Sequence, residues 1–395
     1  MDQDHGGARR GQGRAGLEDR LTLMRTTQTV MSLRHRDTYY DGGMPGVFSY
    51  SNPHFIHWGS GSLAQLAPEL SRLKATRVAL VTTRSLLSEE SAIGEVRRAL
   101  GEVAVPVTVV IAQHAPVSEV EAAVERAAEA EVDGVVSFGG GSAIDTAKTV
   151  GVKLADRRGA AGRRLPHVAI PTTLSAAELA GSAGFTDASG DKAGLRDPRL
   201  LPDSVIYDAR LTLATPMALW LSTGIRALDH AVEGFLADGL HPFSDVMALE
   251  AVRRLCASLP HAMAEPADLE VRTENQVGAW FSFTLPAQSA TGLSHVMGKQ
   301  IGARHGIPHG VTSCLLLPHV MRYLAANLPE RMALLGQATG SGDPAGDVQR
   351  LIASLGLPQH IADYGVGEPD LQRAAKELGG RYPAEDLLRI YLDAL

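Results

Sequence analysis

Three histidines in the second half of the chain are of the type that binds divalent metals or moves protons. His230 ends the run Gly224-Ile-Arg-Ala-Leu-Asp-His, and His295 and His309 lie fourteen positions apart. Imidazole nitrogen suits zinc, iron, copper or nickel, and three such donors leave coordination positions open for water or a substrate. Imidazole is also the natural proton carrier near neutral pH.

Arg226 stands four residues before His230, where a carboxylate would complete a set of metal ligands. A guanidinium stays protonated in proteins and has no lone pair to donate. About 4 Å from a dication, at an effective dielectric near 20, it would face roughly 8 kcal/mol of repulsion. The sequence therefore predicts a site without a bound metal.

Lys299 follows His295 at the same spacing that separates Arg226 from His230. Residues four apart on a helix project from one face, so two pairs of a cation and an imidazole are expected. Such charge suits an anionic substrate such as a carboxylate or phosphonate, with Arg226 as a bidentate clamp. It would also stabilise a developing alkoxide oxygen. The alternative for Arg226 is an internal ion pair with Asp229 or Glu233.

A glycine-rich turn joins a predicted strand to a predicted helix, and it consists of Gly139, Gly140, Gly141 and Ser142. Glycines let a backbone approach a phosphate, and the amides that open a helix attract a pyrophosphate. The run is neither the G-x-G-x-x-G fingerprint nor a P-loop. The alternative is a tight structural turn.

Two further pairs of residues follow predicted strands. Thr172 and Thr173 could hydrogen-bond a cofactor at the carboxyl ends of the strands, or could merely cap a helix. Thr83 and Arg84 end the first clear strand, at a point where an acid would bind a ribose 2′-hydroxyl. Because Arg84 could instead pair with a 2′-phosphate, NADPH is expected to be tolerated or preferred.

The elements that position these residues change in type along the chain. Apolar runs at 77–83, 105–112, 134–138 and 167–171 predict buried strands, and helical runs separate them. This alternation is typical of a doubly wound, Rossmann-like parallel sheet. After residue 208 the pattern is helical, at 216–238, 242–259, 293–302, 315–324 and 370–395. We expect a flexible extension over 1–45, a nucleotide-binding α/β domain over 46–208 and an all-α domain over 209–395.

Composition excludes several classes of protein. Of 395 residues, 45% are hydrophobic and 21% charged, which favours a large core, and the net charge of −7 without a basic patch argues against nucleic-acid binding. No apolar run reaches the roughly 20 residues of a membrane span. Two cysteines and no secretory h-region predict a cytoplasmic protein.

Taken in order, several motifs resemble those of the iron-containing alcohol dehydrogenase superfamily. They are His57-Trp-Gly-Ser-Gly-Ser-Leu63, Phe138-Gly-Gly-Gly-Ser-Ala-Ile-Asp145, Ala169-Ile-Pro-Thr-Thr173, Ala231-Val-Glu233, Gly292-Leu-Ser-His295 and Ile307-Pro-His309-Gly. Within the superfamily, Gln113-His-Ala-Pro-Val117 and the stretch from Lys192 to Asp208 are similar to maleylacetate reductases. Lys192 therefore joins the candidate catalytic residues.

The resemblance implies a dehydroquinate synthase-like fold in which the active site lies between the two domains. It implies hydride transfer from a nicotinamide bound along the glycine turn, and a homodimer. Metal-dependent members use an Asp and three His, which fall on Arg226, His230, His295 and His309, while a further family histidine falls on Lys299. Maleylacetate reductases also lack that Asp and work without metal, but usually place Asn there, so Arg226 departs even from them.

These observations predict a metal-independent, NAD(P)H-dependent reductase of a small, anionic carbonyl or enol substrate. One alternative keeps the fold but uses the site for acid–base chemistry, as a lyase, dehydratase or isomerase. Others are a metal-dependent alcohol dehydrogenase and a homologue that only binds. The aromatic run Trp280, Phe281 and Phe283 would form either an apolar wall of the site or part of an ordinary core helix.

Overall fold

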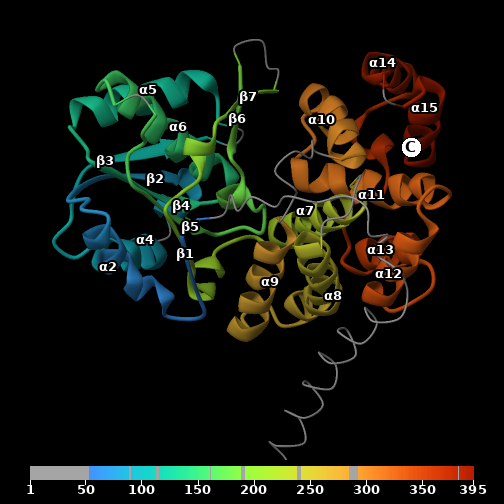
Figure 1. The fold of residues 1–395 in the computed structure, drawn as a ribbon, viewed down its shortest axis with the longest axis horizontal. Helices are drawn as coiled ribbons and strands as arrows, with labels where there is room; N and C mark the ends of the chain where they lie inside the picture. The colour runs from blue at the N-terminus through green and yellow to red at the C-terminus, as the bar shows by residue number, and fades with distance from the viewer. Residues whose placement is uncertain are drawn as a thin grey trace, which may run out of the picture. The chain divides into compact units, whose positions relative to one another are not determined.

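The first half of the described chain is built on a parallel β-sheet. The structure is a computed structural model that describes residues 53–395 except 89, 113–114, 161, 188–191, 238–241, 284–291 and 381. All the pairings in the six-stranded sheet are parallel, in the order β1-β8-β5-β4-β2-β3 (Figure 1). Its strands are β1 (Phe55–Trp58), β2 (Arg77–Thr83), β3 (Ala104–Ile111), β4 (Gly134–Gly139), β5 (His167–Pro171) and β8 (Ser204–Tyr207).

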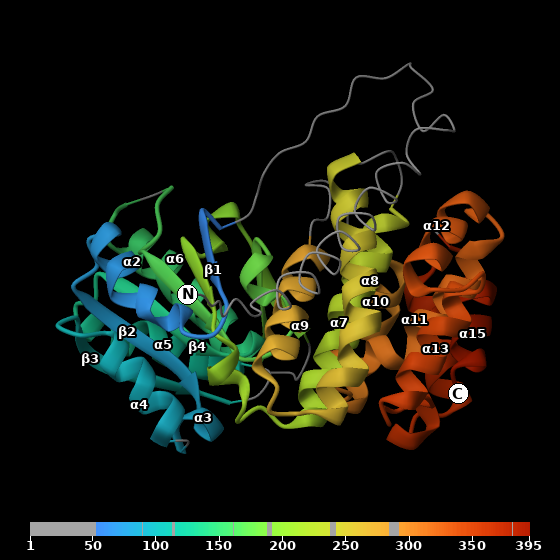
Figure 2. The same cartoon turned by 90° about the horizontal axis from the view of Figure 1, so that it is seen from below.

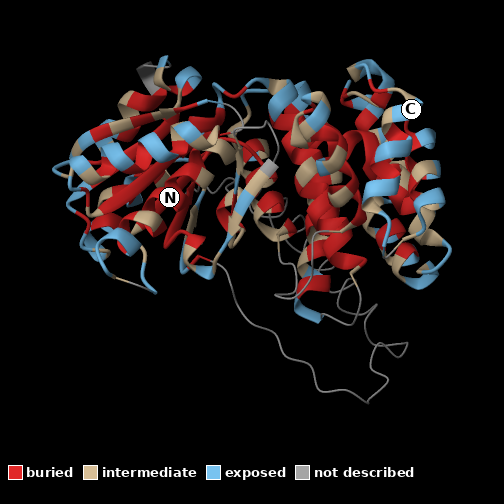
Figure 3. Cartoon of the chain, turned by 90° about the horizontal axis from the view of Figure 1, so that it is seen from above, coloured by how far each residue is buried: buried red, intermediate tan, exposed pale blue. Residues whose placement is uncertain are grey.

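Apolar side chains leave both faces of this sheet, because alternate residues of a strand point in opposite directions. From β2, Leu80 packs with α2 and α4 on one face, and Val81 packs with α5 and α6 on the other. Burial of both faces explains why β2, β4 and β5 are nearly continuous apolar runs (Figure 3). The helices of this half are α2 (Leu66–Arg72), α3 (Arg84–Ser88), α4 (Glu90–Ala99), α5 (Val117–Glu129) and α6 (Gly141–Arg157).

After β8 the regular elements of the described residues are helices (Figure 2). The central helix α7 (Met217–Phe235) is apolar on most sides and almost wholly buried. It packs into a core with α8 (Pro242–Ala264), α9 (Leu269–Ser282), α11 (His309–Ala325), α12 (Pro329–Thr339) and α13 (Pro344–Ser354). A second core joins α10 (Leu293–His305) and α11 to α14 (Glu368–Leu378) and α15 (Ala384–Asp393).

Short elements complete the fold. An antiparallel hairpin of β6 (Ser182–Thr186) and β7 (Lys192–Arg196) follows β5. Single 3₁₀ turns are η2 (Ser62–Gln65), η3 (Ala177–Leu179), η4 (Pro198–Leu200), η5 (Ala209–Thr212) and η6 (Ile361–Tyr364). Among the helices that the structure describes, none combines the length and the apolarity that crossing a bilayer requires.

The predicted fold class is confirmed: a doubly covered parallel sheet precedes a helical region. The four predicted strands correspond to β2, β3, β4 and β5, while β1, β8 and the hairpin were not predicted. The helical tail predicted over 370–395 is two helices, α14 and α15. The domain boundary near residue 209 stays a prediction. The predicted extension over 1–45 and the motif residues Gln113 and His114 lie outside the described residues.

Candidate active site

The candidate cofactor residues of three strands meet at one edge of the sheet. Thr82 of β2 pairs with Phe138 of β4, and Gly139 of β4 pairs with Pro171 of β5. The carboxyl ends of these parallel strands are therefore adjacent, and Thr83, Gly139 and Thr172 stand together there. A backbone hydrogen bond of 3.0 Å from the Thr172 N–H to the Gly139 carbonyl links two of the ends. This edge is where open α/β sheets bind nucleotides.

The glycine turn leaves the start of α6 open. Gly139 has φ +154°, a conformation rare for other residues, and Gly140 is the N-cap of α6. A Cβ on Gly140 would lie 2.9 Å from Cγ2 of Thr173, so the turn and the residues after β5 are in contact. Gly141 and Ser142 form the first turn of α6, whose amides point out of the helix. The turn thus has the narrow, donor-rich shape that a pyrophosphate needs.

The remaining candidates at this edge differ in exposure. Thr172 and Thr173 are buried, and the Thr172 carbonyl accepts a hydrogen bond of 2.7 Å from the Thr215 hydroxyl. Thr83 ends β2, with its hydroxyl 3.1 Å from that of Ser85. Arg84 is exposed at the start of α3, so its guanidinium is accessible to a phosphate.

A second group of candidates is centred on two stacked histidines. His230 of α7 and His295 of α10 are buried, with ring centroids 4.6 Å apart and planes inclined by 30°. Phe283, at the end of α9, packs edge-on against His230 at 4.9 Å. The structure therefore brings together two of the three predicted histidines and one of the predicted aromatic residues.

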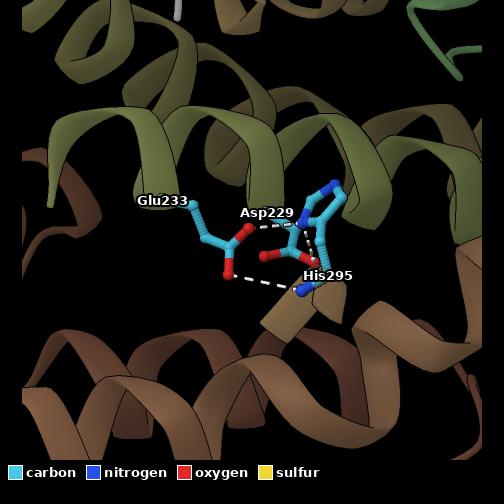
Figure 4. Close-up of side chains that lie close together, drawn as sticks. All are labelled: Asp229, Glu233 and His295. Atoms are coloured by element: carbon cyan, nitrogen blue, oxygen red, sulfur yellow. Dashed lines mark hydrogen bonds and ion pairs between the residues drawn. The ribbon is translucent and has the colours of Figure 1, made fainter. Parts of the chain in front are cut away.

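Two buried carboxylates contact His295 (Figure 4). Oε2 of Glu233 lies 2.5 Å from the Nδ1 atom of His295, and Oδ2 of Asp229 lies 3.4 Å from the same atom. Oδ2 of Asp229 also accepts hydrogen bonds from the hydroxyls of Ser294 (3.0 Å) and Ser313 (2.6 Å). Asp229 thereby joins α7 to the start of α10 and to α11.

Burial dominates the electrostatics of this cluster. It raises the pKa of Glu233 to about 7, against the opposing charge of Arg226, and that of Asp229 to about 6. It lowers the pKa of His295 to about 3 and that of His230 well below its usual range, and Arg226 lowers both further. All four shifts favour the neutral forms, as expected where water is excluded.

Arg226 lies next to this cluster without pairing directly with a carboxylate. Its guanidinium donates a 3.2 Å hydrogen bond to the Ser313 hydroxyl, which in turn donates to Asp229. No carboxylate oxygen of the described residues lies within 4.0 Å of it, so the ion pair considered with Asp229 or Glu233 is not formed. Burial lowers the pKa of Arg226, and the charges of Asp229 and Glu233 oppose that shift.

The other cations lie on neighbouring elements. Lys299 stands one turn after His295 on α10, and loss of hydration around its amine, followed by the charges of Arg226 and Arg196, lowers its pKa. Arg196, at the end of β7, is exposed. Positive groups from α7, α10 and β7 therefore act on one another.

Two predicted residues are placed only by their elements. His309 is the first residue of α11, one turn before Ser313. Lys192 begins β7, opposite Thr186, and its side chain lies outside what the structure describes.

The described donors do not fit the metal that the resemblance implies. Asp229, Glu233 and His295 offer three ligand atoms within 4.8 Å of one another. However, two ligands held at about 2.1 Å from one tetrahedral metal would lie roughly 3.4 Å apart, whereas Nδ1 of His295 and Oε2 of Glu233 are 2.5 Å apart. These two atoms already satisfy each other, and Arg226 occupies the position of the missing ligand.

Sequence reasoning did not assign Asp229, Glu233, Ser294 or Ser313 to the site. The carboxylates were considered only as partners of Arg226. Asp229 and Glu233 are four apart on α7 and therefore share a face, which was the available signal. Their contact with His295, more than sixty positions along the chain, had none.

Comparison with known proteins agrees with this geometry. The model of the iron-containing alcohol dehydrogenase family matches residues 53–209, and that of the family's C-terminal region matches residues 220–378. A maleylacetate reductase of Sphingobium indicum is 32% identical over 323 residues, covering 82% of this chain and 88% of the relative.

Solved structures of the same family superpose on the chain. The maleylacetate reductase of Rhizobium sp. strain MTP-10005 has a TM-score of 0.79 at 30% identity, covering 89% of this chain and 99% of its own. An iron-containing alcohol dehydrogenase from Corynebacterium glutamicum has a TM-score of 0.79 at 27% identity, covering 90% and 98%. These likenesses identify an NAD(P)H-dependent reductase. The chain belongs to the iron-containing alcohol dehydrogenase family, and its full-length likeness includes maleylacetate reductases.

Proposed function

We propose that the protein uses NAD(P)H to reduce a small anionic carbonyl or enol compound of the maleylacetate type, without a bound metal. The observation that carries this proposal is the buried Arg226, which stands beside two stacked histidines where metal-dependent relatives place a carboxylate ligand. Its fixed positive charge suits an anionic substrate and opposes a metal ion.

The carboxyl edge of the sheet would hold the cofactor. The glycine turn and the open start of α6 are suited to its pyrophosphate, and Thr172 and Thr173 to its polar groups. Arg84 is positioned to meet a 2′-phosphate. When bound, the cofactor supplies a hydride, and the residues around His295 must do the rest.

Binding of the anion is assigned to the cations of three elements. Arg226 can clamp one carboxylate through two parallel hydrogen bonds, and Lys299 adds a point charge one turn beyond His295. Arg196 lies close enough to Lys299 to lower its pKa, so it belongs to the same positive region. A neutral alcohol or aldehyde would leave these charges unbalanced, which favours substrates that carry one or more carboxylates.

Proton transfer is assigned to the imidazoles. As hydride reaches the carbonyl carbon, negative charge develops on the oxygen and must be stabilised and neutralised. Nε2 of His295 is buried and has no hydrogen-bond partner among the described residues, so it is free to meet that oxygen. His230 and Phe283 restrict the ring and exclude water from it. His309 is a further candidate at the start of α11.

The test is the oxidation of NADPH and NADH by purified protein, followed by absorbance, with maleylacetate as the first substrate. Activity is expected to survive exhaustive chelation, and metal analysis of the active protein to find far less than one metal per chain. Activity that is lost on chelation and restored by Fe²⁺ or Zn²⁺ would overturn metal independence.

The non-redox alternative is supported by one observation, the buried pair of carboxylates beside His295. Protein that binds NADPH tightly but oxidises it with none of a panel of keto and enol acids would favour that alternative.

A further inference from the structure

Glu233 controls the start of α10 from outside the helix. Its Oε1 accepts the backbone N–H of Ser294 at 2.5 Å and approaches that of His295 at 3.4 Å. Gly292, the N-cap of α10, provides no side-chain cap of its own. A Cβ at position 292 would lie 2.6 Å from Oε1 of Glu233, so the carboxylate takes the space that a capping side chain would fill. The same α10 carries His295 and Lys299.

The second oxygen of Glu233 contacts the ring of His295. Oε2 lies 2.5 Å from Nδ1, a separation at which a single proton must lie between the two atoms. Asp229 approaches the same nitrogen at 3.4 Å, and its Oδ2 also accepts from Ser294 and Ser313. One carboxylate therefore sets both the place of the backbone of His295 and the surroundings of its Nδ1.

The location of that proton determines the state of the opposite ring nitrogen. If the proton lies on Glu233, Nδ1 accepts it and a neutral ring must carry its hydrogen on Nε2. If the proton lies on Nδ1, the neutral ring has a lone pair at Nε2. His230 and Arg226 on α7, Lys299 on α10 and Ser313 on α11 surround the pair. No second acid of the described residues comes as close to the ring as Glu233.

We propose that Glu233 is a positioning residue that acts through His295 as a two-step proton relay. This inference rests on the proposed reductase function. Hydride adds to the carbonyl carbon, and the electron pair of the C=O bond moves to oxygen. The Nε2 proton passes to that oxygen, while the proton of Glu233 passes to Nδ1. NAD(P)H is oxidised to NAD(P)⁺, the carbonyl is reduced to an alcohol, and Glu233 is left as a carboxylate that solvent reprotonates.

The variant Glu233→Gln tests the relay. An amide carbonyl still accepts the Ser294 N–H, but the NH₂ group can only donate to Nδ1, so His295 is locked with its hydrogen on Nε2. We expect kcat to fall by about 100-fold or more, with KM for NADPH and substrate within about threefold. Glu233→Asp keeps an acid and should recover part of kcat.

The tautomer can be measured without turnover, by ¹⁵N NMR of the histidine ring in the ligand-free protein. In alkaline solution the wild type is expected to carry the ring hydrogen on Nδ1, and Glu233→Gln on Nε2. Glu377→Gln is the matched control, because Glu377 also bonds to α10, through Gln300 and Arg304 near its far end. It should change neither the tautomer nor kcat.

Two results would overturn the relay: the same tautomer in wild type and Glu233→Gln, or a kcat of Glu233→Gln within threefold of wild type. If the wild type reduces no anionic carbonyl compound, the reductase function fails, whereas the tautomer experiment still decides whether Glu233 controls His295. Should Glu233→Gln fail to fold, Glu233→Asp supplies the same comparison of tautomer and kcat.

Discussion

Gly140 and Thr173 face each other across the glycine turn, so closely that a Cβ at position 140 would lie 2.9 Å from Cγ2 of Thr173 and 3.1 Å from its hydroxyl. Two motifs that are separate in the sequence, one after β4 and one after β5, therefore form a single structural unit. The backbone hydrogen bond between Thr172 and Gly139 closes the same unit.

Gly140→Ala is expected to weaken cofactor binding. The added methyl group must displace Thr173, and overpacking of this kind costs about 1–3 kcal/mol, which corresponds to a Kd for NADPH roughly 10- to 100-fold higher. Fluorescence titration with NADPH measures it. Gly342→Ala is the matched control, since a Cβ there meets no atom within 4 Å. Equal Kd values for the two variants would remove the glycine turn from the cofactor site.

Arg226→Gln is expected to raise KM for an anionic substrate. Loss of a charge-assisted hydrogen-bond pair costs about 2–3 kcal/mol, or roughly a 30- to 100-fold increase in KM, with little effect on a neutral aldehyde. Arg226→Lys should not restore the wild-type value, because an ammonium cannot form the planar, two-point contact. The measurement is steady-state kinetics with paired charged and neutral substrates. A parallel rise in KM for both would contradict the anion clamp.

The strands that sequence reasoning identified are those whose burial is visible locally. In β2, β4 and β5 both faces are covered, so nearly every residue is apolar. Edge strand β1 mixes exposed and half-buried residues, and β8 is only four residues long. These strands are defined by pairing with each other across the length of the α/β half, which no local pattern contains.

The site divides in the same way. Spacing of four residues along a helix placed Arg226 with His230 and Lys299 with His295, and motif order placed the glycine turn. The contact between Glu233 and His295 depends on how α10 docks against α7, and the Ser313 bridge depends on α11. Such tertiary contacts leave no periodic trace in one sequence.

Arg84→Ala is expected to reduce a preference for NADPH over NADH. The exposed guanidinium at the start of α3 is positioned to pair with the 2′-phosphate, and an exposed charge pair contributes about 0.2–1 kcal/mol, or roughly two- to fivefold in KM. KM for NADH should stay unchanged. Competition experiments with both cofactors measure the ratio, and a wild type that strongly prefers NADH would contradict this assignment.

Asp208→Asn is expected to destabilise the protein in a pH-dependent way. The buried Asp208 carboxylate accepts the N–H groups of Gly61 and Leu63 and pairs with Arg210. Burial alone would raise the pKa of Asp208, but these partners outweigh it and hold the pKa below its ordinary 3.8. Its stabilisation is therefore present above pH 3.8 and is lost as pH falls through the lower value of the folded state.

Urea unfolding measures this effect. At neutral pH the variant should lose about 2 kcal/mol, since a charge-assisted contact is removed, and the difference should narrow as pH falls below 3.8. Asp347→Asn, at a more exposed carboxylate with a lowered pKa, is a control expected to lose less. A difference between wild type and Asp208→Asn that is independent of pH would contradict the account.

The pairing of β1 with β8 has a consequence for synthesis of the chain. Gly61 and Asp208 are 147 positions apart, and β1 has no other neighbour in the sheet. At about 5–20 residues per second, a ribosome needs roughly 7–30 s to make the intervening segment. The first strand therefore leaves the ribosome long before its partner exists. For that interval its backbone is an open edge, available to a chaperone or to another nascent chain.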